Sequence, residues 1–198
     1  RSKRMLAFSK IEGTGPTVVF LGGFNSEMAG TKALHLEDWA KREGNSYLRF
    51  DYSGHGVSSG KFSEGCIGDW ADDAEDAIQR TTDGPLILIG SSMGGWIALL
   101  MVQRMAERIA ALITIAAAPD FTEDGFWNRF SEQQKSEIME NGMIFLPSEY
   151  GEPYPITRRL IEDGRNHLIL RSSFQVDFPV YMLQGDKDQS VTRETALR

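Results

Sequence analysis

Residues 85–102 join an apolar strand to a helix through the pentapeptide Gly-Ser-Ser-Met-Gly, and this junction limits the possible folds more than any other feature. Pro85–Ile89 forms an apolar run of strand length, and Trp96–Val102 has the composition of a helix. A Gly-x-Ser-x-Gly motif at such a turn is typical of a nucleophile elbow, where small residues let the backbone turn sharply and expose the serine hydroxyl. We therefore predict that Ser92 is a covalent nucleophile; the alternative is a small-residue turn without chemistry.

Apolar runs of strand length alternate with helical patterns along most of the chain. This alternation predicts an α/β fold with a mostly parallel central sheet and helices on both of its faces. The 198 residues suffice for one hydrophobic core, and no repeat or linker divides them, so we expect a single domain over residues 1–198. We expect strands at 5–11, 17–21, 47–51, 85–89, 111–118 and 178–183, and helices at 32–42, 67–79 and 96–102.

Residues 120–167 interrupt this alternation and mix aromatic with charged side chains. We interpret this segment as a cap that is inserted after a core strand and covers the site, with a helix at 131–140. An ordinary extended crossover between two strands is the alternative. The core pattern resumes at about residue 178. The aromatic residues of the segment are Phe121, Phe126, Trp127, Phe130, Phe145, Tyr150 and Tyr154.

Composition excludes several classes of function. The net charge of −7 and the pI near 5.0 argue against binding to nucleic acid, because phosphate recognition requires a basic face. The longest apolar run, Ile109–Ala118, is too short to span a membrane, and no signal peptide is visible. The single cysteine, Cys66, excludes an internal disulfide and suits a reducing compartment; it is a weak alternative nucleophile. We expect a cytoplasmic protein, or one of the mitochondrial matrix if the source is eukaryotic.

Acyl transfer by a serine requires a base, an acid that orients the base, and donors for the oxyanion. One donor is the backbone N–H of the residue after the nucleophile, here Met93, and we assign the second to Phe24, after an earlier strand. Two carboxylates follow the last predicted strand. We favour Asp188 over Asp186 as the acid, because a Gly-x-x-Asp-x-x-Val pattern places Asp188 beyond the turn.

The base is the missing element of this set. The usual order of serine, acid and histidine requires a histidine after Asp188, and residues 189–198 contain none. We expect His35 to occupy a half-exposed helix position. We expect a structural role for His55 near the carboxyl edge of the sheet, with a place in the pocket lining as the alternative. His167 precedes the acid and is not expected to act as the base, so we expect the base to lie beyond residue 198.

Four segments of the chain resemble the α/β-hydrolase superfamily, namely Leu21–Phe24, Gly30–Leu34, Phe50–Gly56 and Gly90–Trp96. In combination they are similar to a narrower branch, which contains bacterial serine hydrolases and the animal mitochondrial acyl-protein thioesterase that also cleaves acyl-glucuronides. The resemblance covers nearly the whole chain. The chain departs from the pattern at Gln184, where a non-catalytic histidine is often found, and in lacking the C-terminal histidine segment.

This resemblance implies an α/β-hydrolase fold whose C-terminal part is not included in the chain. It implies Ser92 as the nucleophile and Asp188 as the triad acid, with no metal and no organic cofactor. The implied reaction is hydrolysis of an acyl ester or thioester through an acyl-enzyme, on a small-molecule or acyl-protein substrate. A hydrolase-fold binding protein without catalytic activity is the alternative. The sequence is silent on oligomeric state.

Overall fold

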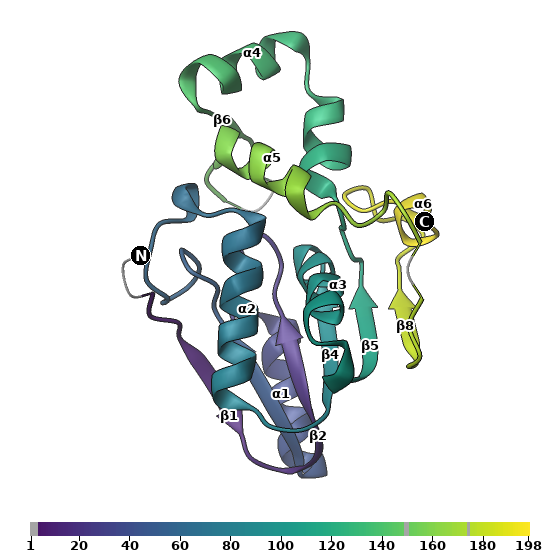
Figure 1. Ribbon diagram of the computed structural model, residues 1–198. Helices are drawn as coiled ribbons and strands as arrows, with labels where there is room; N and C mark the ends of the chain where they lie inside the picture. The colour runs from purple at the N-terminus through teal and green to yellow at the C-terminus, as the bar shows by residue number, and fades with distance from the viewer. Residues whose placement is uncertain (1–3, 149–150, 174) are drawn as a thin grey trace.

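A computed structural model describes residues 4–148, 151–173 and 175–198, so Tyr150 lies outside the described residues. Its central sheet has six strands in the order β1-β3-β2-β4-β5-β8 (Figure 1). Only β1 runs antiparallel to its neighbour, and the other four pairings are parallel, which confirms the predicted sheet. The strands are β1 (Phe8–Ile11), β2 (Thr14–Leu21), β3 (Asn45–Phe50), β4 (Leu86–Ser91), β5 (Ile109–Ile115) and β8 (Val180–Leu183).

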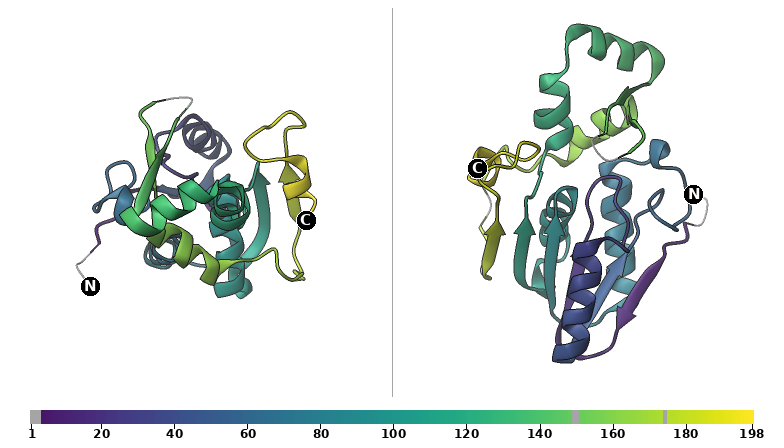
Figure 2. Two further views of the ribbon diagram at one scale, coloured as in Figure 1. Left: turned by 90° about the horizontal axis from the view of Figure 1, so that it is seen from above. Right: turned by 180° about the vertical axis from the view of Figure 1, so that it is seen from behind.

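Helices cover both faces of this sheet (Figures 1 and 2). Helix α1 packs on one face, where Ala33 and Ala40 share a buried cluster with Tyr47 of β3. Helices α2 and α3 pack on the other face, where Trp70 and Trp96 belong to a larger buried cluster. The predicted helices are confirmed, with longer bounds, as α1 (Thr31–Glu43), α2 (Ile67–Thr81) and α3 (Met93–Arg104).

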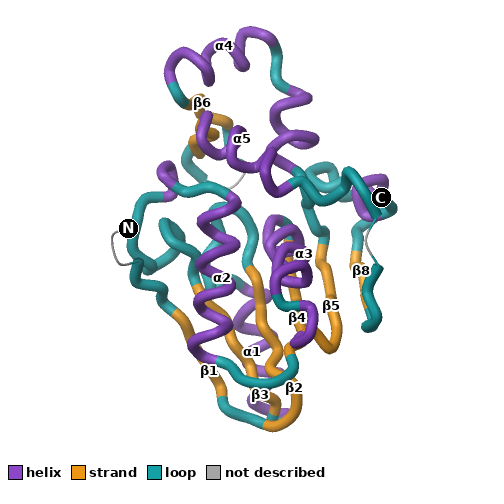
Figure 3. The backbone as a smooth tube through the Cα atoms, in the orientation of Figure 1, coloured by secondary structure: helices purple, strands orange, loops and turns teal. Residues whose placement is uncertain are grey.

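The segment between β5 and β8 contributes no strand to the central sheet within the described residues. Its described residues between 121 and 167 lie beyond the carboxyl ends of the parallel strands, above the sheet in Figure 1, and Figure 3 shows helices there joined by loops and two short strands. The predicted helix at 131–140 is confirmed as α4, which Ser131 caps by accepting the Gln134 N–H. The segment contains a π-helix (Phe121–Phe126), α4 (Glu132–Asn141), the hairpin β6 (Met143–Leu146) and β7 (Tyr154–Thr157), and α5 (Arg158–Gly164).

Strand β8 forms one edge of the sheet and is paired only with β5 among the described strands. The predicted strand at 178–183 is confirmed from residue 180, but its side chains are not buried. Val180 is 41% exposed, and each of the next three residues is 57% to 59% exposed. A helix of four residues, α6 (Arg193–Ala196), follows it. None of the helices within the described residues is long and apolar enough to cross a bilayer.

Candidate active site

Ser92 lies between β4 and α3 with a backbone φ of 54° and ψ of −120°. A positive φ is uncommon for a residue other than glycine, and it reports a sharp, strained turn. The flanking positions have no room for a side chain. An added Cβ at Gly94 would lie 1.9 Å from the Leu21 carbonyl oxygen, and one at Gly90 would lie 2.3 Å from the Gly94 oxygen. The geometry of the Gly-x-Ser-x-Gly junction is therefore that of a nucleophile elbow.

The Ser92 side chain is half-buried, and it does not cap the helix that follows. Its hydroxyl makes no hydrogen bond with the described part of the chain, although the backbone N–H donates to the Ile115 carbonyl at 3.0 Å. The loop after β2 approaches it closely, since a Cβ added to Gly23 would lie 3.4 Å from the Ser92 Cβ. The backbone turn thus places the Ser92 side chain beside this loop, with its hydroxyl unpartnered among the described residues.

Two backbone N–H groups near this hydroxyl have no acceptor within the described part of the chain. Met93 is the first residue of α3, so its N–H has no acceptor inside the helix. Phe24 lies in the loop after β2, and neither N–H donates to an acceptor among the residues that the structure describes. Strands β2 and β4 are neighbours, with Leu21 opposite Gly90, so both groups lie at the same edge of the sheet.

This edge is also the topological switch point of the sheet. Strand β2 is followed by α1 on one face, and its neighbour β4 is followed by α3 on the other face (Figures 1 and 2). Ligands of open α/β sheets bind in the crevice beyond the carboxyl ends of the strands at such a point. The position of Ser92 therefore agrees with the place where the fold favours ligand binding.

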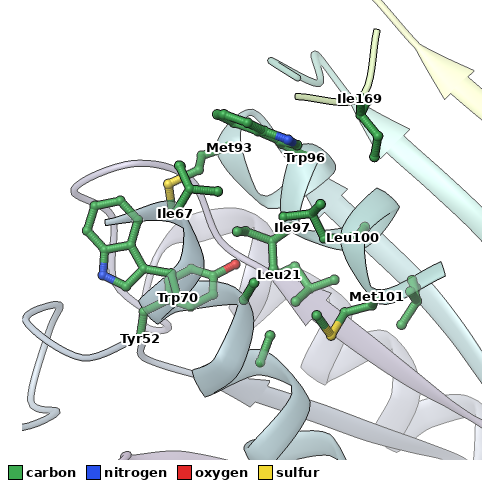
Figure 4. Packing of buried hydrophobic residues seen from close by; sticks show 14 of the residues in the cluster. Leu21, Tyr52, Ile67, Trp70, Met93, Trp96, Ile97, Leu100, Met101 and Ile169 are labelled. Carbon is green, nitrogen blue, oxygen red and sulfur yellow. The ribbon is translucent and has the colours of Figure 1, made fainter. Parts of the chain in front are cut away.

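The Phe24 ring lies at the centre of an aromatic cluster that joins the core to the segment between β5 and β8. From the core, Phe62 and Trp70 lie with ring centroids 4.8 Å and 5.9 Å from that of Phe24. From the inserted segment, Phe121 and Tyr154 lie at 5.4 Å and 5.9 Å. All four contacts are edge-to-face, the favoured arrangement of aromatic pairs. Figure 4 shows Trp70 and Trp96 on either side of Met93 and Ile67 in the core beneath.

Residues 51–57 form a loop that holds the loop of residues 22–28 at three points. The Tyr52 hydroxyl donates to the Gly22 carbonyl at 3.2 Å, and the His55 Nε2 accepts the N–H of Asn25 at 3.2 Å. Asp51 Oδ1 accepts the N–H of Met28 at 2.6 Å. Sequence reasoning expected a structural role for His55, and these contacts confirm one. It missed the role of Tyr52, because the two loops are about thirty residues apart in the chain.

The two candidate acids differ in their surroundings. Asp188 is half-buried, and its Oδ1 accepts the N–H groups of Ser190 and Val191 at 2.9 Å each. Its Oδ2 accepts no hydrogen bond from the described residues. The Asp186 side chain is 84% exposed and lies 3.9 Å from Arg193. Both follow β8, whose Leu183 is in register with Ile115 of β5, which in turn pairs with Ser91.

The remaining histidines lie in other surroundings. His35 is exposed on α1 rather than half-exposed as predicted. The Nε2 of His167 lies 3.6 Å from Asp163 Oδ2 and faces Gly68 of α2. The backbone oxygen of His167 accepts the indole N–H of Trp96 at 2.9 Å. Within the described residues, no hydrogen bond joins a histidine to Ser92.

Cys66 is 2% exposed, and burial raises the pKa of its thiol to about 12. A thiol with such a pKa is protonated at neutral pH and is a poor nucleophile. No group of three or more histidine, cysteine, aspartate or glutamate residues within the described ranges is arranged to hold a metal ion.

The comparisons with known proteins agree with this geometry. The family described as serine aminopeptidase, S33, matches residues 14–159. The human protein named palmitoyl-protein thioesterase ABHD10, mitochondrial, is 37% identical over 195 residues, which cover 98% of this chain. A crystal structure described as a hydrolase from Agrobacterium vitis S4 has a TM-score of 0.94 at 39% identity, covering 98% of this chain and 78% of its own. Mouse alpha/beta hydrolase domain-containing protein 10 has a TM-score of 0.90 at 35% identity, covering 100% of this chain and 80% of its own.

The chain spans 63% of the length of the human relative. The family match covers most of the chain, and the structural matches extend over nearly all of it. The chain therefore has the α/β-hydrolase fold and belongs to the family described as serine aminopeptidase, S33.

Proposed function

We propose that this chain forms part of a serine hydrolase that cleaves acyl esters or thioesters, with Ser92 as the nucleophile. The observation that carries the proposal is the junction of β4 and α3. There the Ser92 hydroxyl has no described partner and lies beside two N–H groups that have no described acceptor. The names of relatives as thioesterases and esterases support the reaction class.

In this mechanism the Ser92 hydroxyl attacks the carbonyl carbon of the substrate and gives its proton to a histidine base. The N–H groups of Met93 and Phe24 bind the oxyanion, each contributing roughly 3 kcal/mol by comparison with similar donors. Collapse of the intermediate releases the alcohol or thiol with that proton and leaves an acyl-enzyme, which water hydrolyses by the same steps. Asp188 orients this histidine base through its Oδ2.

The aromatic cluster around Phe24 supports an apolar acyl group as the substrate. In this proposal the insertion of residues 120–167 acts as a cap, and Phe121, Phe126 and Tyr154 pack against the acyl chain as it lies beside Ser92. A palmitoylated protein and a small acyl ester are both compatible with these surroundings. The mitochondrial naming of the relatives supports the mitochondrial matrix as the compartment for a eukaryotic source, with the cytoplasm as the other candidate.

Covalent labelling with a fluorophosphonate tests the nucleophile. The complete gene product should react, Ser92→Ala should reduce labelling to background, and Ser136→Ala should label like the wild type because Ser136 is exposed on α4. Equal labelling of wild type and Ser92→Ala would exclude Ser92. A panel of acyl thioesters, p-nitrophenyl esters and acyl-glucuronides then ranks the substrates by kcat/KM.

One observation favours a second candidate, a binding protein that keeps the fold without catalysis. No histidine of the described chain is hydrogen-bonded to Ser92. The triad acid acts only by orienting the base, so Asp188 alone cannot activate Ser92. Such a protein would bind acyl compounds, would not hydrolyse any member of the panel, and would not react with the fluorophosphonate.

A further inference from the structure

The loop of residues 22–28 owes its shape to contacts with another loop. Asn25 has a φ of 55°, in the left-handed region, and the Ser26 N–H donates to the Gly23 carbonyl at 3.2 Å to close a tight turn. This turn directs the N–H of Asn25 to the His55 ring. The carbonyl of Gly22 accepts the Tyr52 hydroxyl. The loop is therefore held two residues before Phe24 and one residue after it.

The hydrogen bonds of His55 fix its protonation state. The Ser53 carbonyl can only accept, so the Nδ1 that lies 3.2 Å from it must carry the proton. Nε2 must then be unprotonated, because it accepts the Asn25 N–H. A doubly protonated ring would place an N–H against another N–H and break this contact.

The surroundings of His55 agree with a neutral ring. His55 is 3% exposed and lies against the rings of Tyr52, Phe62 and Trp70. Burial lowers the pKa of His55 from its ordinary value, and it outweighs the Ser53 carbonyl and the carboxylates of Asp51 and Asp73, which act in the opposite direction. The charged neighbours that act on the ring are thus the Asp51 and Asp73 carboxylates, and the Tyr52 phenol is a titratable group that contacts it.

We propose that Tyr52 and neutral His55 are positioning residues that set the Phe24 amide at the distance from Ser92 that oxyanion binding requires. The inference rests on the proposed function, and it adds two residues that do not touch the substrate. Oxyanion donors must be placed closely to be effective, and loss of one donor lowers kcat by about 100-fold to 1,000-fold in comparable enzymes. Displacement of the loop should therefore lower kcat much more than it changes KM.

The test compares four variants of the complete gene product. His55→Leu removes the acceptor at similar volume, and His55→Gln places an amide oxygen near the position of Nε2. Tyr52→Phe removes only the hydroxyl and should fold normally, while His35→Leu is the exposed control. We expect His55→Leu to lower kcat for a p-nitrophenyl ester roughly 10-fold to 100-fold with KM changed less than about threefold. His55→Gln should recover most of this loss, Tyr52→Phe should lower kcat at least about threefold, and His35→Leu should match the wild type.

Two kinetic results would overturn the proposal. The first is an unchanged kcat in both His55→Leu and Tyr52→Phe, and the second is failure of His55→Gln to recover activity while its thermal unfolding midpoint equals that of the wild type. The ¹⁵N NMR spectrum of the histidine side chains gives a readout that does not depend on catalysis. It should show the His55 ring protonated at Nδ1 alone at pH 7, and protonation at Nε2 would overturn the proposal. A wild-type protein that fails to label with the fluorophosphonate contradicts the proposed function, whereas the NMR result still decides the contact with Asn25.

Discussion

Asp188 and Asp186 lie two positions apart in one loop, yet only one of them has the surroundings of a triad acid. Two backbone N–H groups hold Oδ1 of Asp188, which fixes the carboxylate and leaves Oδ2 free to accept a histidine N–H. The carboxylate of Asp186 is directed to solvent beside Arg193. An acid that orients a base must be held in place itself. The hydrogen bonds to Asp188 therefore give a physical reason to prefer it over Asp186 as the candidate acid.

Substitution of these acids tests the choice. Asp188→Asn should lower kcat of the complete gene product by up to about 10⁴-fold, because an amide no longer holds the histidine in the reactive tautomer. Asp186→Asn, the matched control, should change kcat less than about twofold. Steady-state kinetics with one p-nitrophenyl ester measures both variants. A large loss in Asp186→Asn with a normal Asp188→Asn would reverse the assignment.

At the scale of elements, α1 is joined to β3 by a partly buried ion pair. Glu37 of α1 accepts the Arg49 guanidinium of β3 and the Lys41 ammonium, the latter at 2.7 Å. The hydrogen bond from Arg49 lowers the pKa of Glu37 to about 2, with Lys41 contributing and burial opposing. A pKa below the ordinary value near 4.5 means that the ionised form stabilises the fold.

The pH dependence of stability follows from the sign of this shift. The contribution of the ionised Glu37 to the free energy of unfolding is fully present above about pH 4.5, and it is lost as the pH falls toward about 2. Glu37→Gln should therefore lower the free energy of unfolding by about 2 kcal/mol at pH 7, and the difference from wild type should shrink below pH 4.5. Urea unfolding at several pH values measures it. Glu12→Gln is the control, because the Glu12 side chain is 86% exposed in its pair with Lys10, and it should change stability little at any pH. A pH-independent difference for Glu37→Gln would contradict the argument.

Elements set by local patterns could be predicted from the sequence, and elements set by distant contacts could not. Helices α1 and α2 depend on local patterns, and both lie where the sequence predicted helices. The elbow at Ser92 is also local, because its glycines and serine are adjacent. The motif Phe50–Gly56 is recognisable in the sequence, but the hydrogen bonds from this loop to residues 22–28 are not. They join segments about thirty residues apart, and no local pattern predicts them.

At the scale of the whole molecule, the inserted segment is attached to the core at several separate places. The Asp163 carboxylate of α5 accepts the Gly68 N–H of α2 at 2.8 Å, and the His167 carbonyl accepts the Trp96 indole of α3. The Phe24 ring adds an aromatic contact at the candidate oxyanion loop. Movement of the insertion would therefore change the packing of the Phe24 ring. This contact couples opening of the insertion to the position of the candidate oxyanion loop.

Asp120 joins the two ends of the insertion. It is fully buried, and its carboxylate accepts the N–H groups of Ile169 and Leu170 at 2.7 Å and 2.9 Å, with Arg171 at 3.3 Å. Asp120→Ala leaves these buried N–H groups without an acceptor, so the local free energy of opening should fall by about 3 kcal/mol. Hydrogen exchange should then accelerate from residue 120 to residue 171, while β4 and α3 keep their protection.

Glu132→Ala is the matched control for this prediction, because Glu132 belongs to the same insertion but its side chain is 91% exposed. Its exchange pattern should equal that of the wild type. Equal acceleration of β4 and the insertion in Asp120→Ala would mean that the carboxylate stabilises the whole domain rather than joining the ends of the insertion. Local acceleration alone means that the insertion can open as a unit while Ser92 stays fixed on a folded sheet.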